Sequence, residues 1–411
     1  MNPLVAELTS SAIRDLLALT TAPGMLSLAG GLPAAEAFPV AEIAATTARL
    51  LADRPSSVLQ YGPTEGDPTL RDWVARYEGG RCGRPIVAER VLITSGSQQA
   101  LDLIARTLCR PGDVIVVEEP GYLGALQALR AAGARLEPVP VDAEGLDVDQ
   151  LAARLAAGLR PVAVYTVTTF QNPSGVTLGP TRRRLLAELA ERYAFVVIED
   201  DPYAELGFRS AVGPAAEPGA RPPVRTFTDT GVTLGSFSKT ISPGLRVGWA
   251  VLPEVLVAPV TRLKQAADLH SGALGQAVIA ELVSDDAWWR AHLERVRAVY
   301  AGRAVALAGA LAERFGDRLQ LNTAHGGMFL WGRFTDGTVP ARLLPVALAE
   351  GVAFVPGAEF YTGPPDPHTL RLSYATNPPE ALQRAADRLA RAHATLTCTA
   401  GGGPDRRSVE R

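Results

Sequence analysis

At residues 235–246 the sequence reads Gly-Ser-Phe-Ser-Lys-Thr-Ile-Ser-Pro-Gly-Leu-Arg, which places one amine among small hydroxyl side chains directly after an apolar run. That amine is unusual in this chain, because 40 residues are lysine or arginine and lysine occurs only at positions 239 and 264. A guanidinium stays protonated and does not condense with a carbonyl, whereas a lysine amine can lose its proton in a pocket and form a Schiff base. Lys239 is therefore a candidate nucleophile; a lysine exposed in a surface loop is the alternative interpretation.

The neighbours of Lys239 suit a phosphate group. Ser236 and Ser238 supply hydroxyl donors, and Arg246 supplies a permanent positive charge. Such groups hold a phosphate dianion through charge-assisted hydrogen bonds. An aldehyde that carries a phosphate would use both the amine and these donors, and pyridoxal phosphate is such an aldehyde. We therefore predict a pyridoxal phosphate site around Lys239.

The chain upstream of Lys239 repeats a pattern of strand, turn and helix. Continuous apolar runs, which are typical of strands buried on both faces of a parallel sheet, occupy residues 91–94, 114–117, 163–167, 195–198 and 232–235. This order predicts an α/β fold with a mostly parallel sheet. No Gly-x-Gly-x-x-Gly follows any of these runs, which argues against a dinucleotide-binding fold.

Polar residues, glycine and proline gather where these strands end. The clusters occupy residues 119–122, 171–175, 199–203 and 236–239. Ligands of open α/β sheets bind beyond the carboxyl ends of the strands, so we expect the four clusters to converge on one crevice. The turn at 95–99, before a helix at 100–108, offers free N–H groups to an anion and is a second candidate for holding the phosphate.

Several residues in these clusters have the chemistry that a pyridine ring requires. Asp200 ends a buried strand and could keep the ring nitrogen protonated, because a buried carboxylate and a pyridinium stabilise each other. Asp201 competes for this role, and a turn carboxylate is the alternative for both acids. Asn172 and Tyr203 could donate to the phenolic oxygen, or belong to a turn and a packed aromatic cluster. Tyr122 offers a flat face to the ring, or packs in the core.

From about residue 10 to 395 the chain resembles the class I and II aminotransferases of pyridoxal phosphate fold type I, and in particular the branch of 2-aminoadipate and kynurenine aminotransferases. The resemblance is carried most specifically by SFSKTISPGLRVGW at 236–249 and QNPSG at 171–175. Further motifs in the matching order are SSAIRDLL, SLAGGLP, YGPTEGDPTLR, SGSQQALDL, EPGY, EDDPY, GGMFLW, VPG and LRLSYA. The family fold is a three-layer αβα domain with a mostly parallel sheet of about seven strands, joined to a smaller α+β domain.

The resemblance also implies a role for each cofactor-binding residue. Lys239 would be the Schiff-base lysine and catalytic base, Asp200 would contact the ring nitrogen, and Tyr203 would act with them. The other residues expected to contact the cofactor are Tyr61, Ser97, Gln98, Tyr122, Asn172, Ser236, Ser238 and Arg246. The peptide bonds before Pro120 and Pro173 would be cis.

For the substrate, the resemblance implies that Arg371 binds the α-carboxylate, beside Asn172 and Gly31. The glycine turn that contains Gly31 lets backbone approach a ligand closely, although it is equally compatible with a simple tight turn. Arg14, in a helix expected at residues 3–20, would reach the distal carboxylate of a diacid such as glutamate or 2-aminoadipate. An exposed helix arginine is the alternative for Arg14.

The expected organisation has four parts. Residues 1–40 form an N-terminal arm and part of the small domain, 41–284 the large cofactor-binding domain, 285–396 the C-terminal small domain, and 397–411 a disordered tail. In the small domain the pattern predicts helices at 285–316, 340–350 and 379–394, and strands at 327–331, 352–356 and 370–374. Residues 210–224, which are rich in alanine, glycine and proline, predict an exposed loop. The resemblance further implies a homodimer with a shared active site, to which Tyr61 comes from the partner subunit.

Composition excludes several other classes of protein. A net charge of −3 with dispersed arginines predicts no basic patch that would bind nucleic acid or an anionic membrane. The first residues mix charged with apolar side chains, unlike a signal peptide, and no stretch reaches the length of a membrane span, so we expect a cytoplasmic protein. Three cysteines without CxxC spacing support neither a disulfide framework nor a zinc site, and we predict no metal.

The sequence as a whole predicts an aminotransferase that moves an amino group between an L-amino acid and a 2-oxo acid such as 2-oxoglutarate. One rival is another enzyme on the same scaffold, such as a β-lyase, a decarboxylase or an amino-acid oxidase, because the cofactor serves all of these reactions. A second rival is a non-catalytic effector-binding module, as in regulators that resemble this branch and carry a DNA-binding domain ahead of it. Residues 1–30 are expected to leave no room for such a domain.

Overall fold

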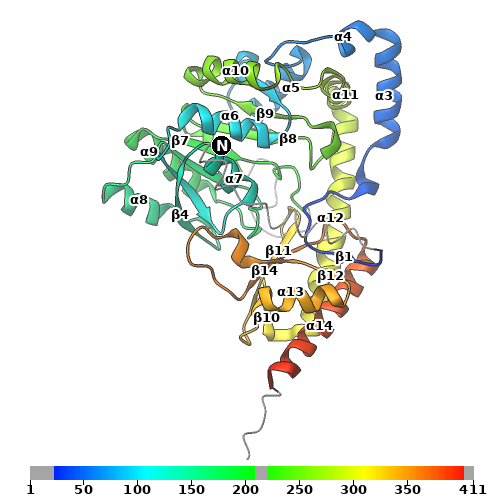
Figure 1. Cartoon of the computed structure of the whole chain (residues 1–411). Helices are drawn as coiled ribbons and strands as arrows, with labels where there is room; N and C mark the ends of the chain where they lie inside the picture. The colour runs from blue at the N-terminus through cyan, green and yellow to red at the C-terminus, as the bar shows by residue number, and fades with distance from the viewer. Residues whose placement is uncertain (1–22, 209–220, 402–411) are drawn as a thin grey trace, which may run out of the picture.

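The computed structural model describes residues 23–208 and 221–401, and its larger part is built on one sheet of eight strands (Figure 1). In spatial order the strands are β2 (Val91–Thr94), β9 (Gly248–Val251), β8 (Val232–Ser236), β7 (Val196–Asp200), β6 (Ala163–Val167), β3 (Val114–Glu119), β4 (Arg135–Asp142) and β5 (Gly145–Leu146). The strands from β8 to β4 are parallel, whereas β9 is antiparallel to both neighbours and β5 is antiparallel to β4. The predicted mostly parallel sheet is confirmed. The strand beyond the expected seven is β5, whose two residues are too few to leave a pattern.

Helices cover both faces of this sheet, as a three-layer fold requires. Successive side chains of a strand point to opposite faces, so Ile115 and Val117 of β3 join one core cluster while Val116 joins another. The first face packs against α6 (Ser97–Leu108), α7 (Leu123–Ala131) and α10 (Glu254–Asp268). The second face packs against α8 (Val148–Ala156) and α9 (Pro180–Tyr193), and at its β2 end against α5 (Pro68–Cys82) and α11 (Ala273–Ser284).

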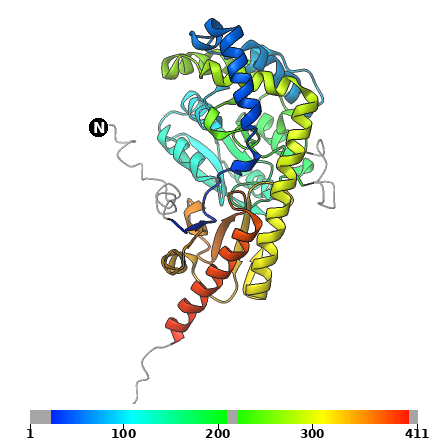
Figure 2. The same cartoon turned by 90° about the vertical axis from the view of Figure 1, so that its right-hand side faces the viewer.

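The smaller part contains an antiparallel sheet. Its strands in spatial order are β10 (Leu319–Leu321), β11 (Phe329–Phe334), β14 (Thr369–Ser373) and β13 (Val355–Pro356). Helices α13 (Pro340–Ala349) and α14 (Pro379–Gly401) pack with it, and the long helix α12 (Asp286–Phe315), yellow in Figure 2, runs beside the large part and reaches the small one. Helices α3 (Val40–Asp53) and α4 (Pro55–Leu59) pack against α11.

The start of the described chain belongs to the small part as well. Strand β1 (Leu26–Ser27) pairs in parallel with β12 (Val352–Ala353), so residues from opposite ends of the sequence form a separate two-stranded sheet. The prediction of one strand at 352–356 is therefore wrong. The chain changes partner at Phe354, whose side chain is fully buried, and continues as β13 against β14.

Two other predictions of irregular structure need correction. The last helix extends to Gly401 and not to about residue 394, because no glycine or proline interrupts residues 395–400; the expected disordered tail at 397–411 is wrong for its first residues. In the predicted exposed loop at 210–224, Arg221 and Val224 are buried, and residues 209–220 lie outside the described residues. The helix predicted at 3–20 also lies outside them. Within the described ranges, no helix is long and apolar enough to cross a membrane.

The register of the large sheet brings the carboxyl ends of its central strands to one edge. Asp200, the last residue of β7, lies beside Val167 of β6 and Leu234 of β8. Because β9 runs in the opposite direction, its first residue, Gly248, pairs with both Ser236 and Thr94, the last residues of β8 and β2. The loops that follow β2, β6, β7 and β8 are therefore neighbours at this edge.

Candidate active site

A cavity of about 460 Å³ opens at this edge of the sheet. It collects nearly all the site residues predicted from the sequence: Gly31, Ser97, Gln98, Tyr122, Asn172, Asp200, Tyr203, Ser236, Ser238, Lys239, Arg246 and Arg371. These residues come from loops that lie far apart in the chain, and the two parts of the fold both contribute. The convergence expected from the strand ends is confirmed.

Lys239 lies in the turn that follows β8. Its Nζ atom donates a hydrogen bond to the carbonyl oxygen of Gly31 at 3.0 Å, so the amine is held against the glycine turn near the start of the chain. Burial, together with the positive charges of Arg371 and Arg246, lowers the pKa of Lys239 from 10.5 to about 8. The neutral, nucleophilic amine is therefore far more populated near neutral pH than it is for an exposed lysine.

Only one oxygen of the Asp200 carboxylate has a hydrogen-bond partner among the described residues. Its Oδ2 atom accepts a hydrogen bond from the Tyr165 hydroxyl at 2.8 Å, whereas its buried Oδ1 atom has no partner among the described residues. Burial raises the pKa of Asp200 from 3.8 to about 7. A buried acceptor without a donor is costly, and a protonated ring nitrogen would supply both the missing donor and a compensating positive charge. Asp200 thus fits the pyridine ring of pyridoxal phosphate.

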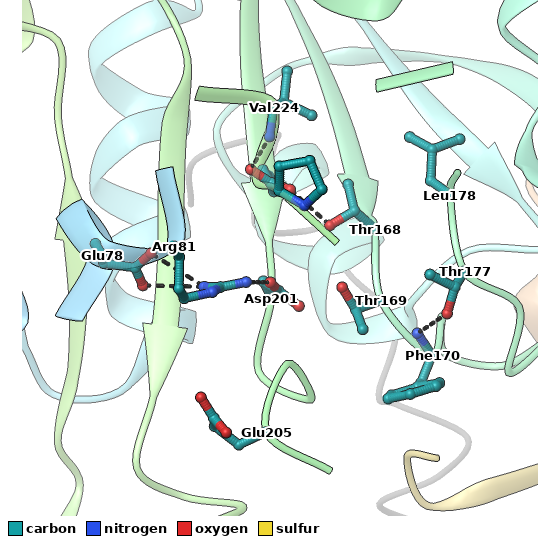
Figure 3. Close-up of polar contacts among 12 residues, drawn as sticks. Glu78, Arg81, Thr168, Thr169, Phe170, Thr177, Leu178, Asp201, Glu205 and Val224 are labelled. Atoms are coloured by element: carbon teal, nitrogen blue, oxygen red, sulfur yellow. Dashed lines mark hydrogen bonds and ion pairs between the residues drawn. The ribbon is translucent and has the colours of Figure 1, made fainter. Parts of the chain in front are cut away.

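The competing acid, Asp201, points away from the cavity. Neighbouring residues at the end of a strand face opposite sides of the sheet, and Asp201 forms an ion pair with Arg81, as Figure 3 shows. Arg81 also pairs with Glu78 at 3.1 Å. On the same side, Glu199 pairs with the buried Arg183 at 2.8 Å. Asp201 therefore already has a cation, whereas Asp200 lines the cavity and has no cation paired with it among the described residues.

The cavity lining offers possible donors to an anion from four residues, Ser97, Ser236, Ser238 and Arg246, which we call the cup. Ser97 begins helix α6, whose free N–H groups and dipole favour negative charge. Ser236 ends β8 and Ser238 lies in the turn that follows, where the Ser236 hydroxyl accepts a hydrogen bond from the Ser238 N–H at 3.0 Å. Arg246 adds a guanidinium to the same cavity lining. This set of donors fits the phosphate of the cofactor.

The position of the Arg246 guanidinium depends on Gly96. Gly96 has a φ of +89°, and a Cβ atom at this position would lie 2.6 Å from a terminal nitrogen of Arg246. The same nitrogen donates to the carbonyl oxygen of Ser95 at 2.9 Å. Any side chain at position 96 would both strain the backbone and displace the guanidinium.

Arg371 is a buried cation without a buried anion. One terminal nitrogen donates to Asn172 Oδ1 at 2.8 Å and the other to the carbonyl oxygen of Ala29 at 2.6 Å, while the buried Nε atom has no partner among the described residues. Its guanidinium carbon lies 4.2 Å from the centre of the Phe329 ring. Burial lowers the pKa of Arg371 to about 10, and no carboxylate of the described residues pairs with it. A ligand carboxylate would satisfy this charge.

Two tyrosines supply the aromatic walls of the cavity. The ring of Tyr122 lies over Gly124, where a Cβ atom would approach the ring to 2.5 Å. Tyr203 is buried and meets the Phe329 ring edge to face, with centroids 6.3 Å apart. The peptide bonds before Pro120 and Pro173 are cis, as the resemblance implied.

One predicted site residue, Tyr61, does not line this cavity, and a second, Arg14, cannot be placed relative to it. Tyr61 is 78% exposed, and its ring contacts His270 with a centroid distance of 5.7 Å, so it does not line the cavity of its own chain. Arg14 lies outside the described residues.

Sequence reasoning missed two residues that shape the site. Tyr165 was assigned only to an apolar strand, although a tyrosine hydroxyl in a buried strand requires a partner, which is the signal that would have found it. Phe329 carried no such signal, because a phenylalanine in a strand is usually a core residue, and its contact with Arg371 depends on the tertiary fold.

Comparison with known proteins places this geometry in context. Residues 24–389 match the family model described as aminotransferase class I and II. The chain is 43% identical to a 2-aminoadipate transaminase of Thermus thermophilus over 94% of both sequences, and 38% identical to aromatic-amino-acid aminotransferase 1 of Thermococcus litoralis over 93% of this chain and 91% of that protein.

The fold is similar to that of the α-aminoadipate aminotransferase of Thermus thermophilus, solved in complex with N-(5'-phosphopyridoxyl)-L-leucine. The TM-score is 0.87 at 38% identity, with 97% of this chain and 98% of that chain covered.

Proposed function

This chain belongs to the aminotransferases of class I and II, and from that membership we propose which of its residues carry out the transfer. The enzyme uses pyridoxal phosphate to move amino groups between amino acids and 2-oxo acids. One observation carries the assignment of roles. Lys239, Asp200 and Arg371 line a single cavity, and both Asp200 and Arg371 keep a buried polar atom for which the described residues offer no partner.

The cofactor, when bound, supplies an electron sink for the electron pair that remains when a proton leaves the substrate Cα. Lys239 would hold the cofactor through its amine and would carry that proton from Cα as the catalytic base. Its lowered pKa of about 8 suits a group that must accept and return a proton near neutral pH. Asp200 would keep the ring nitrogen protonated, and Tyr165 orients its carboxylate by donating a hydrogen bond to Oδ2.

The remaining residues position the two ligands. Ser97, Gln98, Ser236, Ser238 and Arg246 bind the phosphate end, Tyr122 covers one face of the ring, and Asn172 and Tyr203 donate to the phenolic oxygen. Arg371 binds the substrate α-carboxylate, next to the carbonyl groups of the glycine turn at Gly31. The rings of Tyr122, Tyr203 and Phe329 line the same cavity.

We propose a cytoplasmic homodimer in which Tyr61 completes the phosphate site of the partner subunit. The exposed position of Tyr61 and its absence from its own cavity support this arrangement. For substrates, the names of the two curated relatives favour 2-aminoadipate or aromatic amino acids as amino donors, with a 2-oxo acid such as 2-oxoglutarate as acceptor.

The proposed function is tested by following the absorbance of the cofactor in the purified holoenzyme. Single amino acids are added in turn, and each effective donor is expected to convert the spectrum in one half-reaction that a 2-oxo acid then reverses. Release of carbon dioxide, ammonia or hydrogen peroxide in proportion to the amino acid consumed would instead identify a decarboxylase, a lyase or an oxidase. A spectrum that changes on binding without any conversion of amino acid to 2-oxo acid would indicate an effector-binding module.

Replacing Arg371 with alanine is expected to weaken binding of every amino-acid substrate while leaving the bound cofactor in place. Loss of a bidentate contact to the α-carboxylate from a buried guanidinium costs about 2–5 kcal/mol. Substrate affinity and cofactor absorbance are measured in parallel. Arg371→Lys serves as the matched control and should retain only part of the affinity, because it keeps the charge and loses the planar fork. Loss of cofactor with unchanged substrate affinity would place Arg371 elsewhere.

Arg14→Ala tests the choice of substrate. If Arg14 binds a distal carboxylate, its loss should weaken transition-state binding of glutamate and 2-aminoadipate by about 2–5 kcal/mol and lower their kcat/KM accordingly. For leucine, kcat/KM should change little. The measurement compares kcat/KM for glutamate and for leucine in the wild type and in Arg14→Ala. An equal change for the two substrates would show that Arg14 does not recognise the side chain.

A further inference from the structure

Lys264 is the second of the two lysines in a chain that otherwise uses arginine. It lies on α10 and its side chain is fully buried, although it does not line the active-site cavity. Its Nζ atom contacts Asp268 Oδ1 at 2.7 Å, Ser271 Oγ at 3.1 Å and Gln99 Oε1 at 3.5 Å. A buried ammonium is expensive unless such partners compensate it, so a lysine retained here requires an explanation beyond surface charge.

The partners of Lys264 lead directly to the turn that precedes helix α6. Asp268 Oδ2 accepts hydrogen bonds from Gln99 Nε2 at 2.7 Å and from Ser95 Oγ at 3.3 Å. Gln99 Oε1 in turn accepts from the backbone N–H of Ser95 at 2.8 Å. The carbonyl oxygen of Ser95 is bound by Arg246 from the cup. The turn at Ser95 is therefore held on one side by Arg246 and on the other by the Lys264 cluster, which comprises Lys264, Asp268, Ser271 and Gln99.

The cluster also balances charge. Asp268 is only 25% exposed in its side chain, and Lys264 is its ion-pair partner. Without Lys264, a partly buried negative charge would remain next to the turn that must attract a phosphate dianion. Removing the lysine would therefore both loosen the turn and add an unfavourable charge, and the second effect acts only on a ligand that carries negative charge.

We propose that Lys264 is a positioning residue for the cofactor phosphate, which acts through Asp268, Gln99 and Ser95 on the turn before Ser97 and never touches the phosphate itself. This inference rests on the proposed function, in which the cup at Ser97 and Arg246 holds that phosphate. It assigns the only other lysine of the chain to the same cofactor as Lys239.

The test compares pyridoxal phosphate with pyridoxal, since both aldehydes can react with Lys239 and only one carries a phosphate. Dissociation constants of the two compounds are measured by absorbance on the cofactor-free enzyme, for wild type and Lys264→Met. The ratio of the two constants isolates the contribution of the phosphate. We expect wild type to prefer pyridoxal phosphate strongly, and Lys264→Met to lower that preference about 10- to 100-fold. Residues that hydrogen-bond to the direct ligands of metal sites have effects of this size on affinity. Pyridoxal binding should stay nearly unchanged.

Two further variants sharpen the result. Arg262→Met, at an exposed position of the same helix, removes one positive charge with the same replacement and should behave as wild type. The double variant Lys264→Met/Asp268→Asn removes the uncompensated charge and should restore part of the preference for the phosphate. If both residues were purely structural, the losses of preference caused by the two substitutions would instead add. Melting temperatures of the cofactor-free variants verify that each chain is folded.

The outcomes separate this inference from the function on which it rests. An unchanged ratio in Lys264→Met, or an equal loss for both compounds, would overturn the positioning role while the cup and the aminotransferase assignment stand. A wild-type enzyme that binds pyridoxal as tightly as pyridoxal phosphate would overturn the cup itself, and the role of Lys264 with it.

Discussion

Lys239→Ala is expected to leave a folded chain that has no measurable transaminase activity. The substitution removes the covalent attachment of the cofactor and the base at the substrate Cα together, so the loss should far exceed the ~10²–10⁴-fold effect of general acid–base catalysis alone. Steady-state rates of 2-oxo acid formation, measured at saturating pyridoxal phosphate, give the activity, and circular dichroism reports the fold. Turnover close to that of the wild type would refute the assignment of the active site.

The matched control for this variant is Lys239→Arg. Arginine keeps a positive charge in the cavity and makes comparable hydrogen bonds, but its guanidinium neither condenses with an aldehyde nor releases a proton near neutral pH. The arginine variant should therefore be as inactive as the alanine variant. Activity retained by arginine alone would show that charge, and not amine chemistry, is what the position supplies.

Asp200→Asn is expected to have opposite effects on stability and activity. In the cofactor-free chain, burial raises the pKa of Asp200 from 3.8 to about 7. Between these two pH values the folded chain binds more protons than the unfolded chain, so the contribution of Asp200 to stability falls as the pH rises through this window. Asparagine removes this dependence and should stabilise the cofactor-free chain at pH 8 by roughly 1–4 kcal/mol, because each pKa unit corresponds to about 1.4 kcal/mol.

Activity should fall in the same variant. The neutral amide cannot balance the charge of a protonated ring nitrogen, and loss of a preorganised electrostatic contact of this kind lowers turnover by about 10²–10³-fold. Urea unfolding of the cofactor-free chain at pH 5 and pH 8 gives the stability difference, and kcat/KM at saturating cofactor gives the activity. A stability difference that does not vary with pH would contradict the role of burial at Asp200.

The adjacent acid provides the control. Asp201 is paired with Arg81, so Asp201→Asn removes a favourable charge interaction where Asp200→Asn removes an unfavourable one. Changing one partner of a buried ion pair lowers the free energy of unfolding by about 3–5 kcal/mol at most. The loss should be smaller here because Glu78 still contacts Arg81. Neighbouring aspartates should therefore shift the free energy of unfolding in opposite directions at pH 8.

The sequence predicted which strand ends meet at the cavity, because these strands are apolar runs whose strand character is unambiguous. Ser236 ends β8, Lys239 follows it, and Asp200 ends β7, so the parallel register alone brings them together. The residues alone left the choice between Asp200 and Asp201 open, and only the family resemblance favoured Asp200, since the choice depends on which face of the sheet each residue meets. Arg81, which decides the matter, lies on a helix 120 residues away in the sequence.

Other parts of the fold escaped prediction for different reasons. Strand β4 contains two prolines and only one buried residue, so it has neither a continuous apolar run nor a clean alternation. The division of 352–356 between two sheets is decided by its partners, Leu26–Ser27 and β14, and not by its own residues. The network around Lys264 consists of polar residues at ordinary helical spacing, which leaves only the rarity of lysine in this chain as a signal.

The pairing of β1 with β12 has a consequence for the order in which the protein is made. Ala29 and Gly31, just after β1, hold Arg371 and Lys239 through their carbonyl oxygens, and the contact from Ala29 to Arg371 spans 342 residues. Strand β1 therefore leaves the ribosome long before its strand partner β12. The residues proposed to hold the cofactor within one chain, between positions 97 and 246, are synthesised well before Arg371. During translation, we expect the cofactor half of the cavity to assemble first and the substrate half to close only when the C-terminal lobe folds back onto the start of the chain.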